Sequence, residues 1–403
     1  MKILKANIKH QVKELLRNSS IHGIRYIAED QRTSIEKFIW LCILLISATS
    51  ASITISRLWD KFQLNPTITG LDTDFSLKNI DFPTVAVCPA ISYGSNSVYQ
   101  VAKEFVGNHM NDFDSNIPLL KALVTLTYSN IKAFEKHLAD INRNATTFWN
   151  RQSLRELVFK VHVNCEDIFE SCSFKNEKEK CCSIFKPIYT EQGFCYAFNS
   201  RYYGTGFSEE RTEELKDINS EDDSWMLKIY IKEEADFFVY PTDSVLTYDD
   251  TKLFTRKNGS AVDLMLSLKQ THTDKTVDQL SISQRKCIFP DKFDDSVTLN
   301  YYNDETYSFS YCMMECRLRI VLKLCNCIPP FYAPENYDKN RKCLIDDFMC
   351  LANYSEAISS ISCHHCQLNC FDKIFEPEKL SIDYKDDNGD EIEEMYIKIR
   401  LSS

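Results

Sequence analysis

The chain has 403 residues, of which 44% are hydrophobic, and its formal net charge is -11. This length and composition can bury a substantial core, which excludes a disordered chain, and the acidity argues against a nucleic-acid-binding protein, which would need a concentrated basic face. The charge is unevenly placed. Residues 1–37 contain eight Lys or Arg and four Asp or Glu, a net of +4, so the remainder sums to -15. We expect the two parts to face different surroundings.

Residues 4–17 have apolar side chains at helical spacing with basic residues between them, which predicts a short basic amphipathic helix. The apolar positions are Leu4, Ile8, Val12, Leu15 and Leu16, and the basic ones are Lys5, Lys9, Lys13 and Arg17. Two interpretations stay open: contact with the anionic inner leaflet of a membrane, or packing against an ordinary protein partner.

An uncharged run of nineteen positions follows at residues 38–56. At about 1.5 Å of rise per residue, a helix of this length covers roughly 28 Å, close to the thickness of a bilayer's hydrocarbon core. Trp40 and Trp59 lie near its two ends, where aromatic side chains favour the interface, and the basic excess precedes it. A buried helix of a soluble protein is the competing interpretation, while the basic region is too long for a cleaved signal peptide. We predict a cytoplasmic segment over residues 1–37, a transmembrane helix over 38–58 and an extracellular domain over 59–403.

The residue patterns of three further stretches predict their secondary structure. Residues 71–87 predict short β-segments, residues 98–163 are predominantly helical in pattern, and residues 225–268 mix β-branched and aromatic residues with turn residues, as an antiparallel sheet would. Three Asn-x-Ser/Thr triplets are acceptors for N-linked glycans if they are extracellular. They begin at Asn144, Asn258 and Asn353.

Of the seventeen cysteines, Cys42 lies within the uncharged run and the other sixteen follow it. An even number permits complete pairing, and extracellular surroundings are oxidising, so up to eight disulfides are expected. Zinc binding is the competing use, because the segments at Cys325–Cys327 and Cys363–Cys366 are rich in possible ligands.

The last ten cysteines suggest a ladder. Cys312 and Cys316 are four residues apart in a helix-like run over 311–324 and project from one face, while Cys363 and Cys366, three apart, can share a face of a second helix. If the two helices run antiparallel, the first cysteine of one helix lies beside the last cysteine of the other, so Cys312 would face Cys366 and Cys316 would face Cys363. The predicted nested order is Cys287–Cys370, Cys312–Cys366, Cys316–Cys363, Cys325–Cys350 and Cys327–Cys343. Such a hairpin would be stiffened by covalent bonds rather than by a thick core.

No catalytic pattern competes with this interpretation. The chain contains no Gly-x-Ser-x-Gly, no phosphate-binding glycine-rich loop and no His-Glu-x-x-His. We predict neither an enzyme nor a bound cofactor or metal.

Several segments together resemble the degenerin and epithelial sodium channel family, most closely its insect pickpocket branch. The resemblance covers nearly the whole chain, and it depends on the order and spacing of the segments more than on any one of them. They are 20–26 (SIHGIRY), 65–66 (NP), 81–88 (DFPTVAVC), 193–199 (GFCYAFN), 284–289 (QRKCIF) and 311–316 (YCMMEC).

The resemblance implies roles for individual residues. His22 and Gly23 correspond to the family's cytoplasmic His-Gly motif, where the glycine allows a chain reversal and alteration changes gating. We assign Trp59 and Phe62 to coupling between the extracellular domain and the membrane helix.

The resemblance also implies pairings for the remaining cysteines. Cys88 would bridge Cys195, and Cys172 would bridge Cys182 or Cys181. Cys165 and Cys181 fall outside the commonest family pattern and are expected to form Cys165–Cys181 or to exchange with Cys182.

The fold implied is α+β. It is a membrane-anchored, disulfide-rich extracellular domain with a β-sheet palm and helical finger and thumb in a clenched-hand architecture, preceded by one transmembrane helix. Three such subunits, identical or different, would surround a sodium-selective pore in the plasma membrane. The function implied is that of a subunit of an amiloride-sensitive, ligand- or stimulus-gated cation channel. Its expected partners are the membrane, other channel subunits and the permeant sodium ion, and not nucleic acid.

One departure from the family concerns the pore. The family has a second membrane helix after the palm, which carries the selectivity filter, whereas this sequence ends at Ser403, where the final palm strand is expected. Two interpretations stay open: an incomplete record of a pore-forming subunit, or a non-conducting single-span regulatory or adhesion protein with the same extracellular domain.

Overall fold

The computed structural model describes residues 11–20, 23–64, 66–71, 80–106, 113–139, 150–202, 217–218, 226–257, 260–290, 307–332, 341–384 and 397–401. The chain divides into two compact units, residues 1–71 with 276–285 and residues 72–275 with 286–403, and each is described by itself. His22, Asn144 and Asn258 lie outside the described residues.

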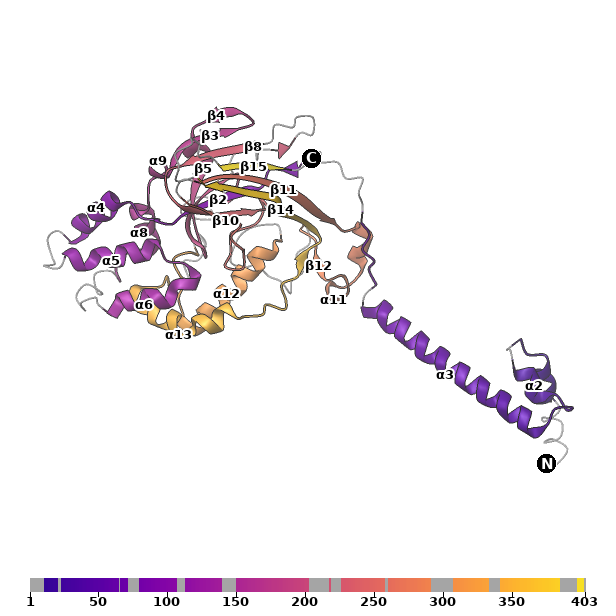
Figure 1. Ribbon diagram of the computed structural model, residues 1–403. Coiled ribbons are helices and arrows are strands. Elements are labelled where there is room, and N and C mark those ends of the chain that lie inside the picture. The colour runs from indigo at the N-terminus through magenta and orange to yellow at the C-terminus, as the bar shows by residue number, and fades with distance from the viewer. Residues whose placement is uncertain are drawn as a thin grey trace. The chain divides into compact units, whose positions relative to one another are not determined.

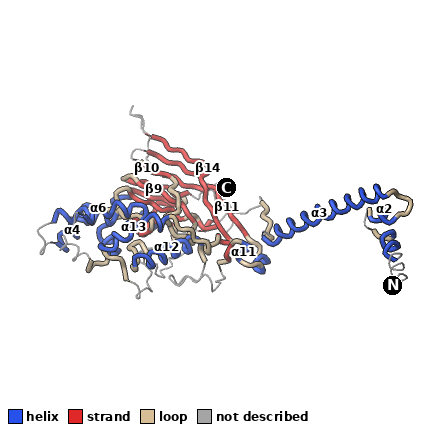
Figure 2. Tube along the Cα trace, turned by 90° about the horizontal axis from the view of Figure 1, so that it is seen from below, coloured by secondary structure: helices blue, strands red, loops and turns tan. Residues whose placement is uncertain are grey.

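The first unit is built around one long helix. Its elements are a helix over residues 11–17, α2 (Ile24–Ala28), α3 (Ser34–Leu64), α11 (Ile282–Arg285) and most of the 3₁₀ turn η2 (Lys275–Gln279). In Figure 2, α3 is a single continuous helix. Its most apolar stretch is not buried inside the protein. With 31 residues, α3 is long and apolar enough to cross a membrane.

The hydroxyl groups within α3 are satisfied by the helix itself. The Thr49 hydroxyl lies 2.9 Å from the carbonyl oxygen of Leu45, and the Thr54 hydroxyl lies 2.9 Å from that of Ser50. A hydroxyl that donates to a preceding carbonyl needs no water. The polar residues of the predicted span are therefore compatible with a helix in lipid.

Two large β-sheets form the centre of the second unit (Figure 1). The five-stranded sheet has the order β10-β9-β2-β6-β5, the six-stranded sheet has the order β14-β11-β15-β8-β3-β4, and β1-β7 and β12-β13 are separate pairs. The strands are β1 (Ile80–Asp81), β2 (Thr84–Pro89), β3 (Phe169–Phe174), β4 (Glu177–Glu179), β5 (Phe185–Thr190), β6 (Gly193–Phe198), β7 (Asp217–Ile218), β8 (Met226–Ile231), β9 (Ala235–Tyr240), β10 (Phe254–Arg256), β11 (Ser260–His272), β12 (Cys287–Ile288), β13 (Leu368–Asn369), β14 (Phe371–Tyr384) and β15 (Ile397–Leu401).

The central strand of the five-stranded sheet explains the β-rich run in the sequence. All six residues of β2 are buried, and the strand pairs antiparallel with β6 on one side and with β9 on the other. A strand covered on both faces needs a continuous apolar run rather than alternation. The β-prediction for residues 71–87 is confirmed over 80–81 and 84–87, and residues 72–79 lie outside the described part.

The stretch predicted as one antiparallel sheet, residues 225–268, is divided between the two sheets. β8 belongs to the six-stranded sheet, whereas β9, the next strand in sequence, belongs to the five-stranded one. β11 pairs antiparallel with β14 but parallel with β15. The residue pattern was right about strands and wrong about their arrangement, because strand propensity does not specify a strand's partners.

The helices of the second unit form two groups. The finger helices are α4 (Ser95–Val106), α5 (Phe113–Val124), α6 (Ile131–Ala139) and α8 (Leu154–Val161), which confirms the helical pattern of residues 98–163 where the structure describes it; residues 107–112 and 140–149 lie outside the described part. They gather at one end of the sheets in Figure 1. We call residues 287–370 the thumb; its helices are α12 (Phe309–Cys325) and α13 (Phe348–Ser359). Short helical turns are η1 (Tyr128–Asn130), α9 (Cys165–Ile168), α10 (Cys181–Ile184) and η3 (Ile345–Asp347).

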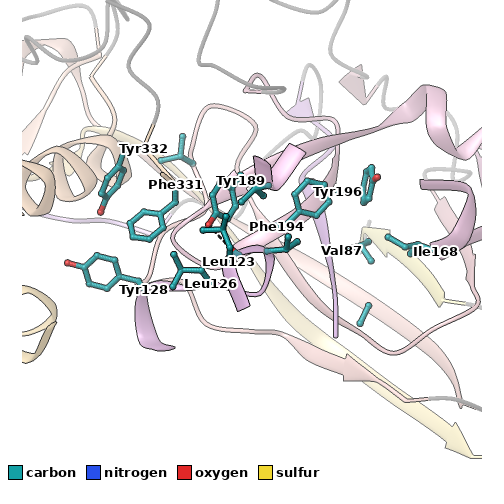
Figure 3. Close-up of a cluster of buried hydrophobic side chains, with 14 of the residues drawn as sticks. Val87, Leu123, Leu126, Tyr128, Ile168, Tyr189, Phe194, Tyr196, Phe331 and Tyr332 are labelled. Atoms are coloured by element: carbon teal, nitrogen blue, oxygen red, sulfur yellow. Dashed lines mark hydrogen bonds between the residues drawn. The ribbon is translucent and has the colours of Figure 1, made fainter. Parts of the chain in front are cut away.

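An apolar core joins finger, thumb and sheet (Figure 3). The ring of Phe331 in the thumb packs edge-to-face with Tyr128 at 5.8 Å and with Tyr189 of β5 at 6.3 Å. Tyr189 is fully buried, and its hydroxyl donates to the carbonyl oxygen of Leu123 at 3.4 Å. Because such rings bury large apolar areas, they fix the base of the thumb to the sheet.

The second unit contains eight disulfides, and six are the predicted pairs. These are Cys88–Cys195, Cys287–Cys370, Cys312–Cys366, Cys316–Cys363, Cys325–Cys350 and Cys327–Cys343. The antiparallel register pairs Val87 of β2 with Tyr196 of β6, so Cys88 lies opposite Cys195 with a Cα–Cα distance of 4.1 Å.

For the other four cysteines the sequence left two arrangements open, and of these the first-named pairs, Cys172–Cys182 and Cys165–Cys181, are wrong, whereas the alternative is present. The structure joins Cys172 to Cys181 and Cys165 to Cys182. β3 and β4 form a hairpin in which Cys172 pairs with Glu179, so Cys181 follows directly beside Cys172. Cys182, one residue later, bonds Cys165 in α9. The hairpin therefore produces a nested order, whereas the predicted bridges would have crossed.

The five thumb pairings are correct, although one local structure behind the argument is wrong. α12 contains Cys312 and Cys316 as predicted, but α13 ends at Ser359, before Cys363. Cys363 and Cys366 lie in a turn closed by a hydrogen bond from Cys366 N to Cys363 O of 2.9 Å. A turn with this three-residue spacing holds two bridges to α12, as a helix would.

Candidate functional site

Gly23 lies where the chain turns back against the long helix of the first unit. Its φ angle is +95°, a conformation that residues with a side chain rarely adopt. A Cβ atom here would lie 3.3 Å from Leu44 and 3.4 Å from Trp40, both on α3. Glycine is needed for the backbone angle, and the absence of a side chain allows the close packing.

The next residues keep this contact. Tyr26 of α2 packs on Trp40 with a ring distance of 4.6 Å, and the Arg32 guanidinium lies 4.5 Å from the centre of the Tyr26 ring. Leu44 is seven residues beyond Lys37, the last charged residue before the span, which corresponds to about 10 Å along a helix. Gly23 therefore lies beside the uncharged part of α3, not merely beside its charged start.

The other end of α3 contacts a segment distant in sequence. Gln284 of α11 donates through Nε2 to the carbonyl oxygen of Gln63 at 3.4 Å. Arg285 stabilises this segment by donating to the Asp278 carboxylate at 3.0 Å and to two neighbouring carbonyl groups. The end of α3 is thus joined to residues 276–285, directly before the thumb in sequence.

The two residues predicted to couple the domain to the helix lie at this end. Trp59 and Phe62 are both 62% exposed on α3, and their rings are 6.4 Å apart. Gln63 and Gln284, which sequence reasoning missed, provide a described contact instead. No local pattern links these two residues, which are separated by 221 positions.

A buried ionic cluster connects the thumb to the sheet in the second unit. Arg317 of α12 donates to both oxygens of Glu191, from Nε at 2.9 Å and from Nη2 at 2.7 Å. Glu191 lies in the turn between β5 and β6. The Tyr332 hydroxyl and the Tyr248 N–H also donate to this carboxylate, the latter at 2.7 Å. Arg317 and Glu191 are each at least 97% buried. Removing one of the two would therefore leave an unpaired buried charge and strongly destabilise the folded unit.

The cluster extends to the loop between β9 and β10. Arg317 Nη1 donates to the half-exposed Asp249 at 2.5 Å. Burial is the largest influence on Arg317 and acts to lower its pKa, but the charge and hydrogen bonds of Glu191, together with Tyr332 and Asp249, outweigh burial and hold that pKa above its usual value. Burial raises the pKa of the neighbouring Asp250, although that carboxylate accepts hydrogen bonds from Thr247 N at 2.6 Å and Oγ1 at 3.0 Å. One arginine thus joins α12 to two separate loops of the sheets.

The zinc interpretation of the thumb cysteines does not fit the geometry. A candidate ligand group in the described residues consists of Cys312, His365 and Cys366. The two sulfur atoms are bonded to each other as a disulfide and so are not thiolate ligands.

The family profile described as amiloride-sensitive sodium channel matches residues 15–400. Sodium channel protein Nach of Drosophila ananassae is 26% identical over 380 residues, which cover 91% of this chain and 71% of that protein. Pickpocket protein 28 of Drosophila melanogaster is 24% identical over 420 residues, covering 91% and 64%. The bile acid-sensitive ion channel of Rattus norvegicus is 24% identical over 323 residues, covering 79% and 60%.

Proposed function

The chain belongs to the amiloride-sensitive sodium channel family, and we propose that it is a subunit of a sodium-permeable, amiloride-sensitive channel opened by an extracellular stimulus. It is a membrane protein of a channel family rather than of an enzyme family. The observation that supports the proposal most is that the family match extends across both the apolar helix α3 and the disulfide-braced domain.

We place the chain in the plasma membrane, with residues 1–37 in the cytoplasm, 38–58 in the bilayer and 59–403 outside. The basic excess before α3 supports this orientation, as positive residues favour the cytoplasmic side. The eight disulfides support extracellular exposure of the second unit, because such bonds persist in oxidising surroundings. The subunit would assemble with two others, identical or different, around a path for sodium ions.

The proposed gating path runs from the thumb to the membrane. The cluster of Arg317 and Glu191 would hold the thumb to the sheets, and Trp59 and Phe62 would couple the domain to α3. His22 and Gly23 would act at the cytoplasmic end. The contact of Gly23 with Trp40 and Leu44 supports this last role, since a movement of α3 must displace the segment packed against it.

The test is electrical recording from cells that express the complete coding sequence, alone and with related subunits, with surface delivery monitored by an extracellular tag. We expect a stimulus-evoked inward current that disappears when external sodium is replaced by a large organic cation and that amiloride blocks. A current unaffected by sodium replacement would refute sodium permeability. A current that requires a second subunit would establish a heteromeric channel.

A further inference from the structure

The helix over residues 11–17 has one face attached to its own unit. Lys13 and Arg17, four residues apart, both form ion pairs with Asp30, and the Arg17 pair measures 2.7 Å. Residues four apart lie on the same helical face. The basic face is therefore held against the segment between α2 and α3.

A neighbouring face of the same helix is apolar and uncovered. Val12 is 50% exposed and Leu15 is 72% exposed, and their three-residue spacing places them on one face. Ile35 and Phe38, in the first turns of α3, are also exposed, at 73% and 64%. An ordinary protein partner for Val12 and Leu15 is therefore not supplied by the described part of this unit.

Chain connectivity keeps this helix near the membrane. Six peptide steps join Arg17 to Gly23, and they span at most about 20 Å. Gly23 itself packs beside Leu44, within the uncharged part of α3. The helix is thus within reach of the interface at the cytoplasmic end of the span.

The charge of the region fits an anionic surface. Residues 1–37 have a net charge of +4, and Asp30 is a single carboxylate shared by two cations. An interfacial helix typically combines a basic face with an apolar face that enters the boundary between headgroups and acyl chains. Anionic lipids of the cytoplasmic leaflet attract such basic segments.

We propose that the helix over residues 11–17 lies in the cytoplasmic membrane interface, with Val12 and Leu15 among the acyl chains and with the net positive charge of residues 1–37 attracting anionic headgroups. The inference rests on the proposed orientation of the chain. It favours a lipid surface over a protein partner, since the apolar face and the net charge are both suited to anionic lipid.

The experiment uses the complete chain carrying Cys42→Ser, so that an introduced cysteine is the single free thiol beside the eight disulfides. An environment-sensitive fluorophore is attached to Leu15→Cys, or to Glu14→Cys as the matched control, which lies about 100° around the helix from position 15. A third variant, Ile46→Cys, reports insertion of α3. The proteins are reconstituted in vesicles of phosphatidylcholine, with or without phosphatidylserine, that contain nitroxide-labelled acyl chains.

We expect the label at position 15 to emit at shorter wavelength than the label at 14 and to be quenched more strongly by the nitroxide, most of all with phosphatidylserine. Equal, water-like behaviour at 14 and 15 overturns the inference. A blue-shifted label at 15 that escapes nitroxide quenching, and whose shift declines as the protein is diluted, also overturns it and identifies a second copy as the occupant. If position 46 is not quenched, the proposed membrane insertion itself has failed.

Discussion

Arg317 and Glu191, 126 residues apart in sequence, form a two-fold hydrogen-bonded ion pair that is almost completely buried. The five disulfides of the thumb hold that lobe together without this pair, and the pair instead joins α12 to the turn between β5 and β6. Its structural role is thus to position the thumb on the sheets.

Arg317→Met should destabilise the second unit by about 3–5 kcal/mol, because the Glu191 charge would stay buried without its main partner. Glu191→Leu combined with Arg317→Met should recover most of this loss, because no unpaired charge remains. Denaturant unfolding of the oxidised protein measures both effects. The control is Arg341→Ala, which removes an exposed ion pair with Asp347 and should cost at most about 1 kcal/mol. Equal costs for Arg317→Met and Arg341→Ala would contradict this account.

Gly23→Ala should loosen α2 from α3. The positive φ angle alone costs a residue with a side chain about 1–2 kcal/mol, and the added methyl group must displace Leu44 or Trp40. We expect faster amide hydrogen exchange over residues 24–28 and altered gating at unchanged surface expression. Gly70→Ala is the matched control, since a Cβ there has no neighbour within 4 Å. Unchanged exchange in Gly23→Ala would show that the contact is not required.

The nested pairing of the finger cysteines can be tested by removing two at a time. Cys165→Ser with Cys182→Ser should leave Cys172–Cys181 intact and only Cys42 reactive. Cys165→Ser with Cys181→Ser removes one member of each bridge and should release two thiols or lower the yield of folded protein. Thiol titration under denaturing conditions separates the cases. The opposite result, with intact pairing only in the second variant, would support the crossed arrangement.

His162 should make the free energy of unfolding of the second unit depend on pH. Its Nδ1 lies 2.7 Å from the Phe159 carbonyl oxygen, and its ring lies 4.5 Å from that of Phe194. Burial lowers the pKa of His162 below 6.5, although the Phe159 contact opposes this effect. The unfolded chain therefore binds the proton first, so this stabilisation is complete above pH 6.5 and is lost as the pH falls through the folded-state pKa.

The measurement compares the free energy of unfolding of His162→Gln with that of the unchanged chain between about pH 7.5 and about pH 5. The variant should lose less stability over this interval, even if it is less stable throughout. Identical slopes would exclude His162 as a contributor.

Asn353 should carry an N-linked glycan if α13 is extracellular. It is exposed on that helix and begins an Asn-x-Ser triplet. In protein from insect or mammalian cells, an endoglycosidase should remove one glycan fewer from Asn353→Gln than from the unchanged chain, which is seen as a smaller loss of mass. Ser355→Thr preserves the acceptor triplet and should show the same loss of mass as the unchanged chain. Absence of any shift at this position would remove one support for the proposed orientation.

Local features of the sequence were enough to predict several parts of the structure. The long apolar helix α3 is predictable because an uncharged run of nineteen residues identifies it without reference to any other segment. The thumb ladder is predictable because the spacing of Cys312 and Cys316 defines one helical face, and a nested order satisfies all ten cysteines even though the second helix ends before Cys363.

Tertiary structure decided what depends on register and on distant partners. Cys181 and Cys182 are adjacent, so only the β3–β4 hairpin determines which of them reaches Cys172. β8 and β9 are successive strands, yet pairing places them in different sheets. Glu191 and Arg317 belong to no common pattern in the sequence, and their interaction arises only when α12 packs over the turn between β5 and β6. Such contacts depend on the free energy of the whole packed unit, which no short segment encodes by itself.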